Sequence, residues 1–348
     1  MDWIYNICSA RDPRFQQQAT ERQTQLTKPP GSLGQLEDIA IRLADCQQTE
    51  TPLAEKVHIA VFAGDHGVAD EGVSAFPQEV TAQMVMNFLH GGAAISVLAK
   101  QLNAELDIID TGIITELPVQ KGLTISRAGK ATANSAKQAA MTEEQLTTAL
   151  NAGFSIIEKA ITNGAQLFIG GEMGIANTTA AAALYSALLG LSPTETSGAG
   201  TGLDDAGIKH KSEVVARILE THKSCGDNPL EWLRCAGGFE IAALTGAYIR
   251  SAQCNLPVIV DGFISSVAAL CAVRINPSIN DFLFFSHLSA EQGHRKVLET
   301  LNQTPLLDLD LRLGEGSGAA ICVNVIRSAC ALQNDMATFA EAAVATKN

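Results

Sequence analysis

The residue best suited to chemistry in this sequence is Glu315, which lies in the run Leu311-Arg-Leu-Gly-Glu-Gly-Ser-Gly318. Glycines on both sides permit positive φ angles and let a ligand approach the backbone closely. A carboxylate in such a turn, at the mouth of an apolar segment, has the access and the partial desolvation that a general base needs. The alternative is a solvated glutamate in an ordinary surface loop.

A second candidate site is the segment Gly170-Gly-Glu-Met-Gly-Ile-Ala-Asn-Thr-Thr179, which follows an apolar run and opens an alanine-rich stretch. Free backbone N–H groups at a helix start, together with threonine hydroxyls, bind phosphate through unpaired donors and the helix dipole. The segment matches neither the Walker A nor the Gly-x-Gly-x-x-Gly pattern. The alternative is that Asn177 and the threonines only cap the helix.

Three more polar residues have spacing that suits ligand binding. The glycine-rich run from Gly198 predicts a flexible loop leading into a helix, and Lys211 at its end could reach a phosphate as a mobile point charge. His287 and Ser289 follow an apolar run and could donate hydrogen bonds to a ligand. The alternatives are a solvated lysine and a histidine that only satisfies a nearby backbone carbonyl.

The segment Gly64-Asp-His-Gly-Val-Ala-Asp-Glu-Gly72 supplies one histidine and three carboxylates, so it could be a metal site. The further partners that would fix a metal geometry are not evident. We therefore favour a role for Asp65 and His66 in ordering the loop.

Short apolar runs followed by glycine turns and helix-like periodicity indicate an α/β fold with a doubly wound, mostly parallel sheet. The expected strands are 57–63, 106–110, 166–169, 257–260 and 281–285. Amphipathic stretches such as 142–160 are expected to be helices. Helices are also expected up to about residue 48, with a break at 28–34, and over 319–345.

Ligands bind beyond the carboxyl ends of the strands in open parallel sheets. Five polar residues come directly after or at the end of predicted strands and are therefore expected on one rim: Asp65, His66, Glu172, Asp261 and His287.

Composition limits the classes of function. The 348 residues are 46% hydrophobic and 18% charged, which is typical of a globular protein, and the net charge of −13 argues against nucleic acid or an anionic membrane as main partner. The eight cysteines include no C-x-x-C pair and are predicted to be reduced, mostly buried thiols. The N-terminus lacks the pattern of a signal peptide. We expect a soluble cytoplasmic protein.

Seven blocks, in one order and spanning nearly the whole chain, resemble the nicotinate-nucleotide–dimethylbenzimidazole phosphoribosyltransferase family of cobalamin lower-ligand synthesis. They are Lys28-Pro-Pro-Gly-Ser-Leu-Gly34, Gly64-Asp-His-Gly67 with Asp70-Glu-Gly72, Gly171-Glu-Met-Gly-Ile-Ala-Asn-Thr178, Gly237-Gly-Phe239, Leu256-Pro-Val258 with Asp261-Gly-Phe263, Ser286-His287 with Ser289-Ala-Glu291, and Arg312-Leu-Gly-Glu-Gly-Ser-Gly-Ala319.

The resemblance implies a Rossmann-like catalytic domain over 55–305, a small helical domain from 1–54 plus 306–348, and a homodimer. It implies transfer of the 5-phosphoribosyl group of nicotinate mononucleotide to 5,6-dimethylbenzimidazole, giving α-ribazole 5′-phosphate and nicotinate with inversion at C1′. The donor's pyridinium leaves as a neutral ring, so neither a metal nor another cofactor is implied.

The resemblance also assigns roles to residues. Glu315 is the general base that takes the acceptor's N–H proton, and Glu172 supports the transition state beside the ribose. Further substrate contacts are expected from Gly174, Asn177, Lys211, Ser289, Asp261, Gly314 and Gly316. Phe76 and Met84 border the benzimidazole pocket, where some relatives have polar side chains, so we expect apolar contact and tolerance of other bases.

Two other classes of function stay open. One is a different nucleotide transferase or hydrolase on the same scaffold. The other is a non-catalytic nucleotide-binding protein, against which the presence of both Glu172 and Glu315 argues.

Overall fold

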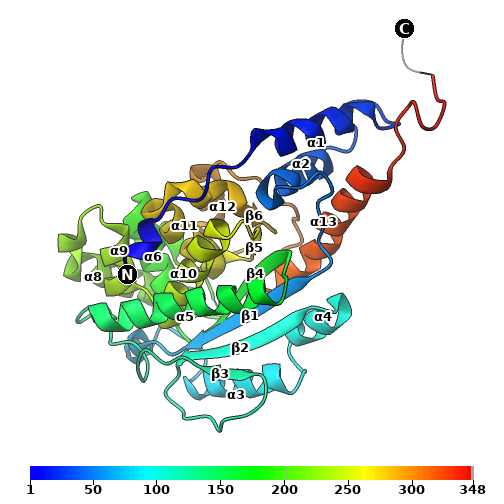
Figure 1. The fold of residues 1–348 in the computed structure, drawn as a ribbon. Helices are drawn as coiled ribbons and strands as arrows, with labels where there is room; N and C mark the ends of the chain where they lie inside the picture. Colours follow the sequence, from blue (N-terminus) through cyan, green and yellow to red (C-terminus); the bar gives the residue numbers. More distant parts are fainter. Residues whose placement is uncertain (201, 346–348) are drawn as a thin grey trace.

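The structure is a computed structural model that describes residues 1–200 and 202–345 (Figure 1). Its centre is a six-stranded sheet in which every pair of neighbouring strands is parallel. The strand order is β3-β2-β1-β4-β5-β6. The strands are β1 (Val57–Gly64), β2 (Glu105–Gly112), β3 (Leu123–Ile125), β4 (Leu167–Met173), β5 (Val258–Val260) and β6 (Leu283–Phe285).

Thirteen α-helices connect and cover these strands in the described part of the chain. They are α1 (Pro13–Gln25), α2 (Gln35–Gln47), α3 (Glu79–Leu89), α4 (Ala94–Leu102), α5 (Glu143–Thr162), α6 (Asn177–Leu189), α7 (Pro193–Thr196), α8 (Asp205–Thr221), α9 (Pro229–Ala236), α10 (Phe239–Gln253), α11 (Phe263–Ile275), α12 (His294–Thr300) and α13 (Ser317–Asp335). Short 3-10 helices are η1 (Asp2–Tyr5), η2 (Gly67–Glu71), η3 (Lys223–Cys225) and η4 (Pro277–Phe282).

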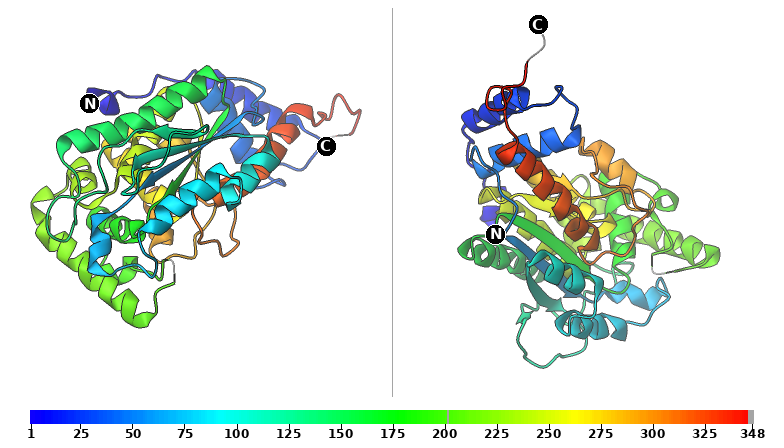
Figure 2. Two further views of the ribbon diagram at one scale, coloured as in Figure 1. Left: turned by 90° about the horizontal axis from the view of Figure 1, so that it is seen from below. Right: turned by 90° about the vertical axis from the view of Figure 1, so that its right-hand side faces the viewer.

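The sheet is buried because helices cover both of its faces (Figures 1 and 2). Helix α10 packs on β1, β2, β4 and β5 with α5 and α11 beside it, while α3, α4 and α13 contact strands from the other face. Every residue of β1 is buried, which explains why its sequence is a continuous apolar run instead of an alternating one. The predicted doubly wound α/β fold is confirmed.

The N-terminal helices α1 and α2 pack with the C-terminal helix α13 beside the sheet (Figure 1). Arg22 Nε donates to the backbone oxygen of Gln333 at 2.5 Å, and Gln23 Nε2 donates to Gln333 Oε1 at 2.6 Å. Ile39 and Leu43 of α2 belong to the same buried cluster as the strands. The boundary between two domains therefore stays a prediction.

Some predicted elements are wrong in extent. Helix α13 ends at Asp335, not at residue 345, because the chain turns extended at Met336 and pairs with the end of α1. There Thr27 N donates to Ala337 O at 3.0 Å and Phe339 N donates to Gln25 O at 2.9 Å. The strand expected from residue 281 begins at Leu283, because η4 occupies the preceding residues. The edge strand β3 was not predicted.

The segment Glu79–Leu102 is the one stretch of the described chain that is long and apolar enough to cross a membrane by length and composition. In the structure a turn at 90–93 divides it into α3 and α4. Both helices contact the sheet. Buried apolar residues of both helices, such as Val85 and Ile95, belong to the core.

Helices α5 and α10 approach so closely that glycines are required at their contact. A Cβ atom on Gly153 would lie 1.9 Å from Ala243 O, and one on Gly246 would lie 2.3 Å from Leu150 O. This contact fixes α10 against the sheet, and α10 begins beside the carboxyl ends of the strands.

Gly153→Ala is expected to destabilise the protein. In a free helix the change would stabilise by about 1 kcal/mol. Here the methyl group collides with a carbonyl, so we expect the free energy of unfolding, measured by urea denaturation, to fall by about 1–3 kcal/mol or more. The control Ser155→Ala, on the exposed side of α5, should change it by less than about 0.5 kcal/mol. Unchanged or raised stability of Gly153→Ala would contradict the packing.

Candidate functional site

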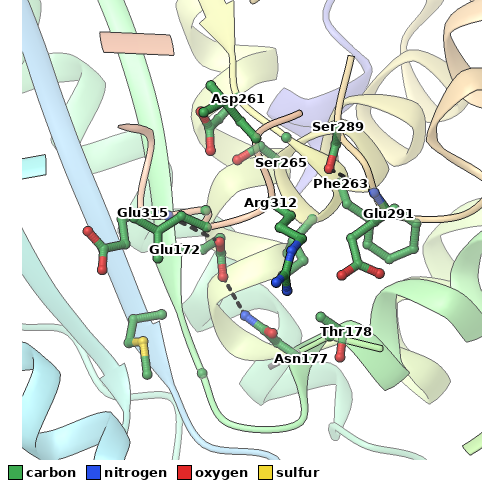
Figure 3. A pocket seen from close by; sticks show the side chains of 18 of the residues that line it. Glu172, Asn177, Thr178, Asp261, Phe263, Ser265, Ser289, Glu291, Arg312 and Glu315 are labelled. Carbon is green, nitrogen blue, oxygen red and sulfur yellow. Dashed lines mark hydrogen bonds between the residues drawn. The ribbon is translucent and has the colours of Figure 1, made fainter. Parts of the chain in front are cut away.

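A cavity of about 700 Å³ opens at the carboxyl ends of β4, β5 and β6 (Figure 3). This is the edge where open parallel sheets bind ligands, next to the reversal of strand order between β1 and β4. Its polar and charged lining residues are Glu172, Asn177, Thr178, Asp261, Ser265, His287, Ser289, Glu291, Asp310, Arg312 and Glu315.

Glu172 lies in β4, one residue before its end, with its side chain almost fully buried. Its Oε2 accepts a short hydrogen bond from Asn177 Nδ2, and its Oε1 accepts from Glu315 N at 3.4 Å. Burial, and next the negative charges of Glu240 and Asp261, raise the pKa of Glu172 to about 8. In the protein alone this carboxyl group is therefore mostly protonated at neutral pH.

Glu315 forms the turn that leads into α13, and the predicted positive φ angles are confirmed. Gly314, Glu315 and Gly316 have φ of +87°, +64° and +87°. Glu315 Oε2 accepts from Ile95 N at 3.4 Å, and the side chain is only 5% exposed. Burial, assisted by the charge of Asp261, raises the pKa of the Glu315 carboxyl. It is therefore not a solvated loop glutamate.

Asp261 holds this turn in place from the end of β5. Its Oδ1 accepts from Ala319 N at 2.8 Å and its Oδ2 from Gly316 N at 3.3 Å. A Cβ on Gly318 would lie 2.2 Å from His287 Nδ1 and 3.1 Å from Asp261 Oδ1. Gly316 itself is not part of the cavity wall, although Gly314 is.

The start of α6 is only partly unpaired: Asn177 N donates to Gly174 O at 3.1 Å and Thr179 N donates to Ala176 O at 3.0 Å, whereas Thr178 N has no partner among the described residues. Its N-terminal residue follows Ala176, whose φ is +75°, and no side chain of the described residues caps the helix. The alternative that Asn177 and the threonines serve as caps is therefore wrong. Gly174 and Thr178 line the cavity beside this helix start.

Lys211 is buried, so the alternative of a solvated lysine is wrong. It lies within α8, is 1% exposed, and its Nζ donates to Thr178 Oγ1 and Gly198 O, each at 3.1 Å. Burial lowers the pKa of Lys211 to about 8, opposed by the charge of Glu291. The amine does not line the cavity, because Thr178 and Gly200 lie between it and the cavity. Thr201 in this loop lies outside the described residues.

Ser289 and His287 lie on the cavity wall after β6, as their spacing predicted. Ser289 N donates to His294 Nδ1 at 2.9 Å. His287 Nδ1 pairs with Ser286 Oγ at 2.9 Å, so its partner is a hydroxyl and not a backbone carbonyl. Burial lowers the pKa of His287, which favours its neutral form.

The opposite end of the cavity is apolar. Phe76, Val80 and Met84 come from the segment around the start of α3, and Met173 and Ile175 follow Glu172. Phe76 is 49% exposed, so its ring is accessible to a ligand in the cavity. Sequence reasoning missed Met173, although its place directly after Glu172 is a signal that could have identified it.

Asp65 and His66 lie at the same sheet edge but do not line the cavity. Asp65 Oδ2 accepts from Ile114 N at 2.8 Å, and His66 Nε2 pairs with Glu240 Oε1 at 2.7 Å. Glu71 is bound by Asn134, Lys137 and Arg217. These groups order loops, and the predicted rim of five polar residues has three members in the cavity: Glu172, Asp261 and His287.

One cluster of three metal-ligand side chains exists among the described residues, formed by Cys225, Glu231 and Cys235. It is remote from the cavity lining. Arg234 binds both carboxylate oxygens of Glu231 at 2.8–3.3 Å, so that ligand is already occupied.

Arg312, Glu291 and Asp310 also line the cavity and were not selected from the sequence as site residues. Arg312 and Glu291 stand inside two of the seven motif blocks, so position in a block was the available signal. Asp310 precedes the last block, so the sequence contained no signal that could have identified it.

Comparison with known proteins covers nearly the whole chain. A family model described as phosphoribosyltransferase matches residues 8–344. A Pseudomonas putida protein named nicotinate-nucleotide–dimethylbenzimidazole phosphoribosyltransferase is 57% identical over 345 residues, covering 99% of this chain and 98% of the relative. A Xanthomonas oryzae protein of the same name is 54% identical over 343 residues, with 99% and 98% covered.

The fold agrees with solved relatives as well. CobT from Thermus thermophilus matches with a TM-score of 0.92 and 46% identity, covering 96% of this chain and 100% of that one. Sequence and fold thus agree over the same residues that build the cavity. The chain belongs to the nicotinate-nucleotide–dimethylbenzimidazole phosphoribosyltransferase family of enzymes.

Proposed function

We propose that the protein transfers the 5-phosphoribosyl group of nicotinate mononucleotide to 5,6-dimethylbenzimidazole, with inversion at C1′. The observation that carries this proposal is the pair of buried carboxyl groups, Glu172 and Glu315, between an apolar pocket and the start of α6. The names of the relatives supply the substrates.

Each end of the cavity suits one substrate. The phosphate is placed against the start of α6, with Gly174, Asn177, Thr178 and Ser289 as contacts and Lys211 behind them. The benzimidazole is placed between Phe76, Met84 and Met173. The ribose then lies between the two ends, where Glu172 and the Glu315 turn stand.

Glu315 is the general base in this proposal. The neutral acceptor attacks C1′ through one ring nitrogen while its other nitrogen loses a proton to the Glu315 carboxylate. Nicotinate leaves from C1′ with the electron pair of the broken bond and becomes a neutral ring nitrogen. Glu172 is favoured in its ionised form once the positively charged donor ring is bound, and then stabilises the positive charge that develops at C1′.

We also propose that the enzyme is a homodimer in the cytoplasm. Its eight cysteines are all free thiols, which fits a reducing compartment. The mass by light scattering tests the dimer.

Glu315→Gln is expected to lower the rate of nicotinate release in the presence of dimethylbenzimidazole by about 10²–10⁴-fold, because the amide cannot take the acceptor's proton. The measurement is nicotinate release from nicotinate mononucleotide, with and without the base. Glu299→Gln, at an exposed position on α12, is the matched control. Release by wild type without any base would instead identify a hydrolase. A fully active Glu315→Gln would remove Glu315 as the base.

The pH dependence of kcat/KM follows from the same carboxylate. A base must be deprotonated, so the rate rises with pH through its pKa. Burial raises the pKa of Glu315 above 4.5, and the acid limb should therefore lie above that pH. The profile is corrected for the acceptor's own protonation, measured by absorbance. The limb should persist in Glu172→Gln; its disappearance there would assign the base to Glu172.

The apolar pocket is expected to tolerate other bases. Wild type should show comparable kcat/KM values for 5-methylbenzimidazole and 5,6-dimethylbenzimidazole, because Phe76 and Met84 contact the ring without hydrogen bonds that read its substituents. Met84→Gln should lower both values, whereas Met86→Gln, outside the cavity wall, should not. A strict preference of wild type for the dimethyl compound would contradict this prediction.

A further inference from the structure

Charge in the cavity is unbalanced for the donor it is proposed to bind. Among the described lining residues, one is an arginine or lysine, Arg312, against the carboxyl groups of Glu172, Asp261, Glu291, Asp310 and Glu315. Nicotinate mononucleotide carries a phosphate at one end and a carboxylate on its pyridine ring. Its pyridinium ring is positively charged, but each of these two anionic groups is bound more favourably beside a cation in a pocket lined by acids.

The guanidinium of Arg312 has no competing partner among the described residues. Ten of the twelve arginines form side-chain hydrogen bonds or ion pairs in the described structure; Arg295 and Arg312 form none. Both side chains are exposed, and Arg295, on α12, lies outside the cavity wall. Arg312, by contrast, points into the cavity on the side of Asn177 and Glu291 (Figure 3).

The two donor anions can be matched to two cations. Lys211 lies behind Thr178 and Gly200, next to the start of α6, and so belongs to the phosphate end. The pyridine carboxylate has no other cation among the described lining residues. A guanidinium also matches a carboxylate with two parallel N–H···O bonds. Arg312 lies three residues before Glu315, on the same segment, and both line the cavity.

We propose that Arg312 binds the carboxylate of the donor's pyridine ring and thereby selects nicotinate mononucleotide over nicotinamide mononucleotide. This inference rests on the proposed function. The neutral amide of nicotinamide cannot compensate the guanidinium charge. Arg312 is thus a specificity residue for the leaving group, while Glu315 acts on the acceptor.

The test compares both mononucleotides as donors for wild type, Arg312→Gln and Arg312→Lys, with dimethylbenzimidazole as acceptor. We expect wild type to prefer the acid, and Arg312→Gln to raise KM for nicotinate mononucleotide by about 10- to 100-fold, as for loss of a charged hydrogen bond. KM for nicotinamide mononucleotide should change less than about 3-fold. Arg312→Lys keeps the positive charge but lacks the two parallel N–H donors of the guanidinium, so its KM for nicotinate mononucleotide should lie between those of wild type and Arg312→Gln.

Controls distinguish a failure of the role proposed for Arg312 from a failure of the proposed function. Arg295→Gln should match wild type, and the melting temperature and the KM for dimethylbenzimidazole should be unchanged in Arg312→Gln. An equal loss for both donors would assign Arg312 to the phosphate and overturn the proposal, as would a wild type indifferent to acid and amide. No turnover of nicotinate mononucleotide by wild type would instead refute the proposed function.

Discussion

The contact on which this site depends is the insertion of the Gly314–Gly316 turn against the backbone of β4. A Cβ on Gly171 would lie 2.1 Å from Glu315 O, and a Cβ on Gly314 would lie 2.4 Å from Glu172 Oε1. Only glycine fits at either position, and both turn glycines need positive φ as well. Through this contact the C-terminal segment delivers one carboxyl group beside another, 143 residues away in sequence.

Burying the carboxyl groups of Glu172, Asp261 and Glu315 close together is unfavourable, and hydrogen bonds offset part of this cost. Asp261 accepts two backbone N–H groups of the turn, and Glu172 accepts from Asn177 and from Glu315 N. Where such bonds are insufficient, the carboxyl group keeps its proton, which the pKa of about 8 for Glu172 expresses. The donor's positive ring would change this balance, so binding and ionisation are coupled.

The helices around the cavity have separate tasks. α6 presents Thr178, whose N–H has no partner among the described residues, α3 supplies apolar side chains, and α8 holds Lys211 under Thr178. The close packing of α5 on α10 keeps the sheet edge rigid behind them. In the proposed function, a phosphate end and an aromatic end flank the two carboxyl groups.

The sequence by itself determined the α/β class and five of the six strands, because buried strands have continuous apolar runs. It also singled out Glu172 and Glu315 as candidate site residues, because both lie in motif blocks that can be recognised in the linear sequence. Only the tertiary structure decided that Lys211 is buried, that α13 stops at Asp335 and that Met173 and Arg312 face the cavity. These depend on contacts between segments far apart in the chain. Local residue types cannot encode such contacts, since burial and direction are set by the partner segment.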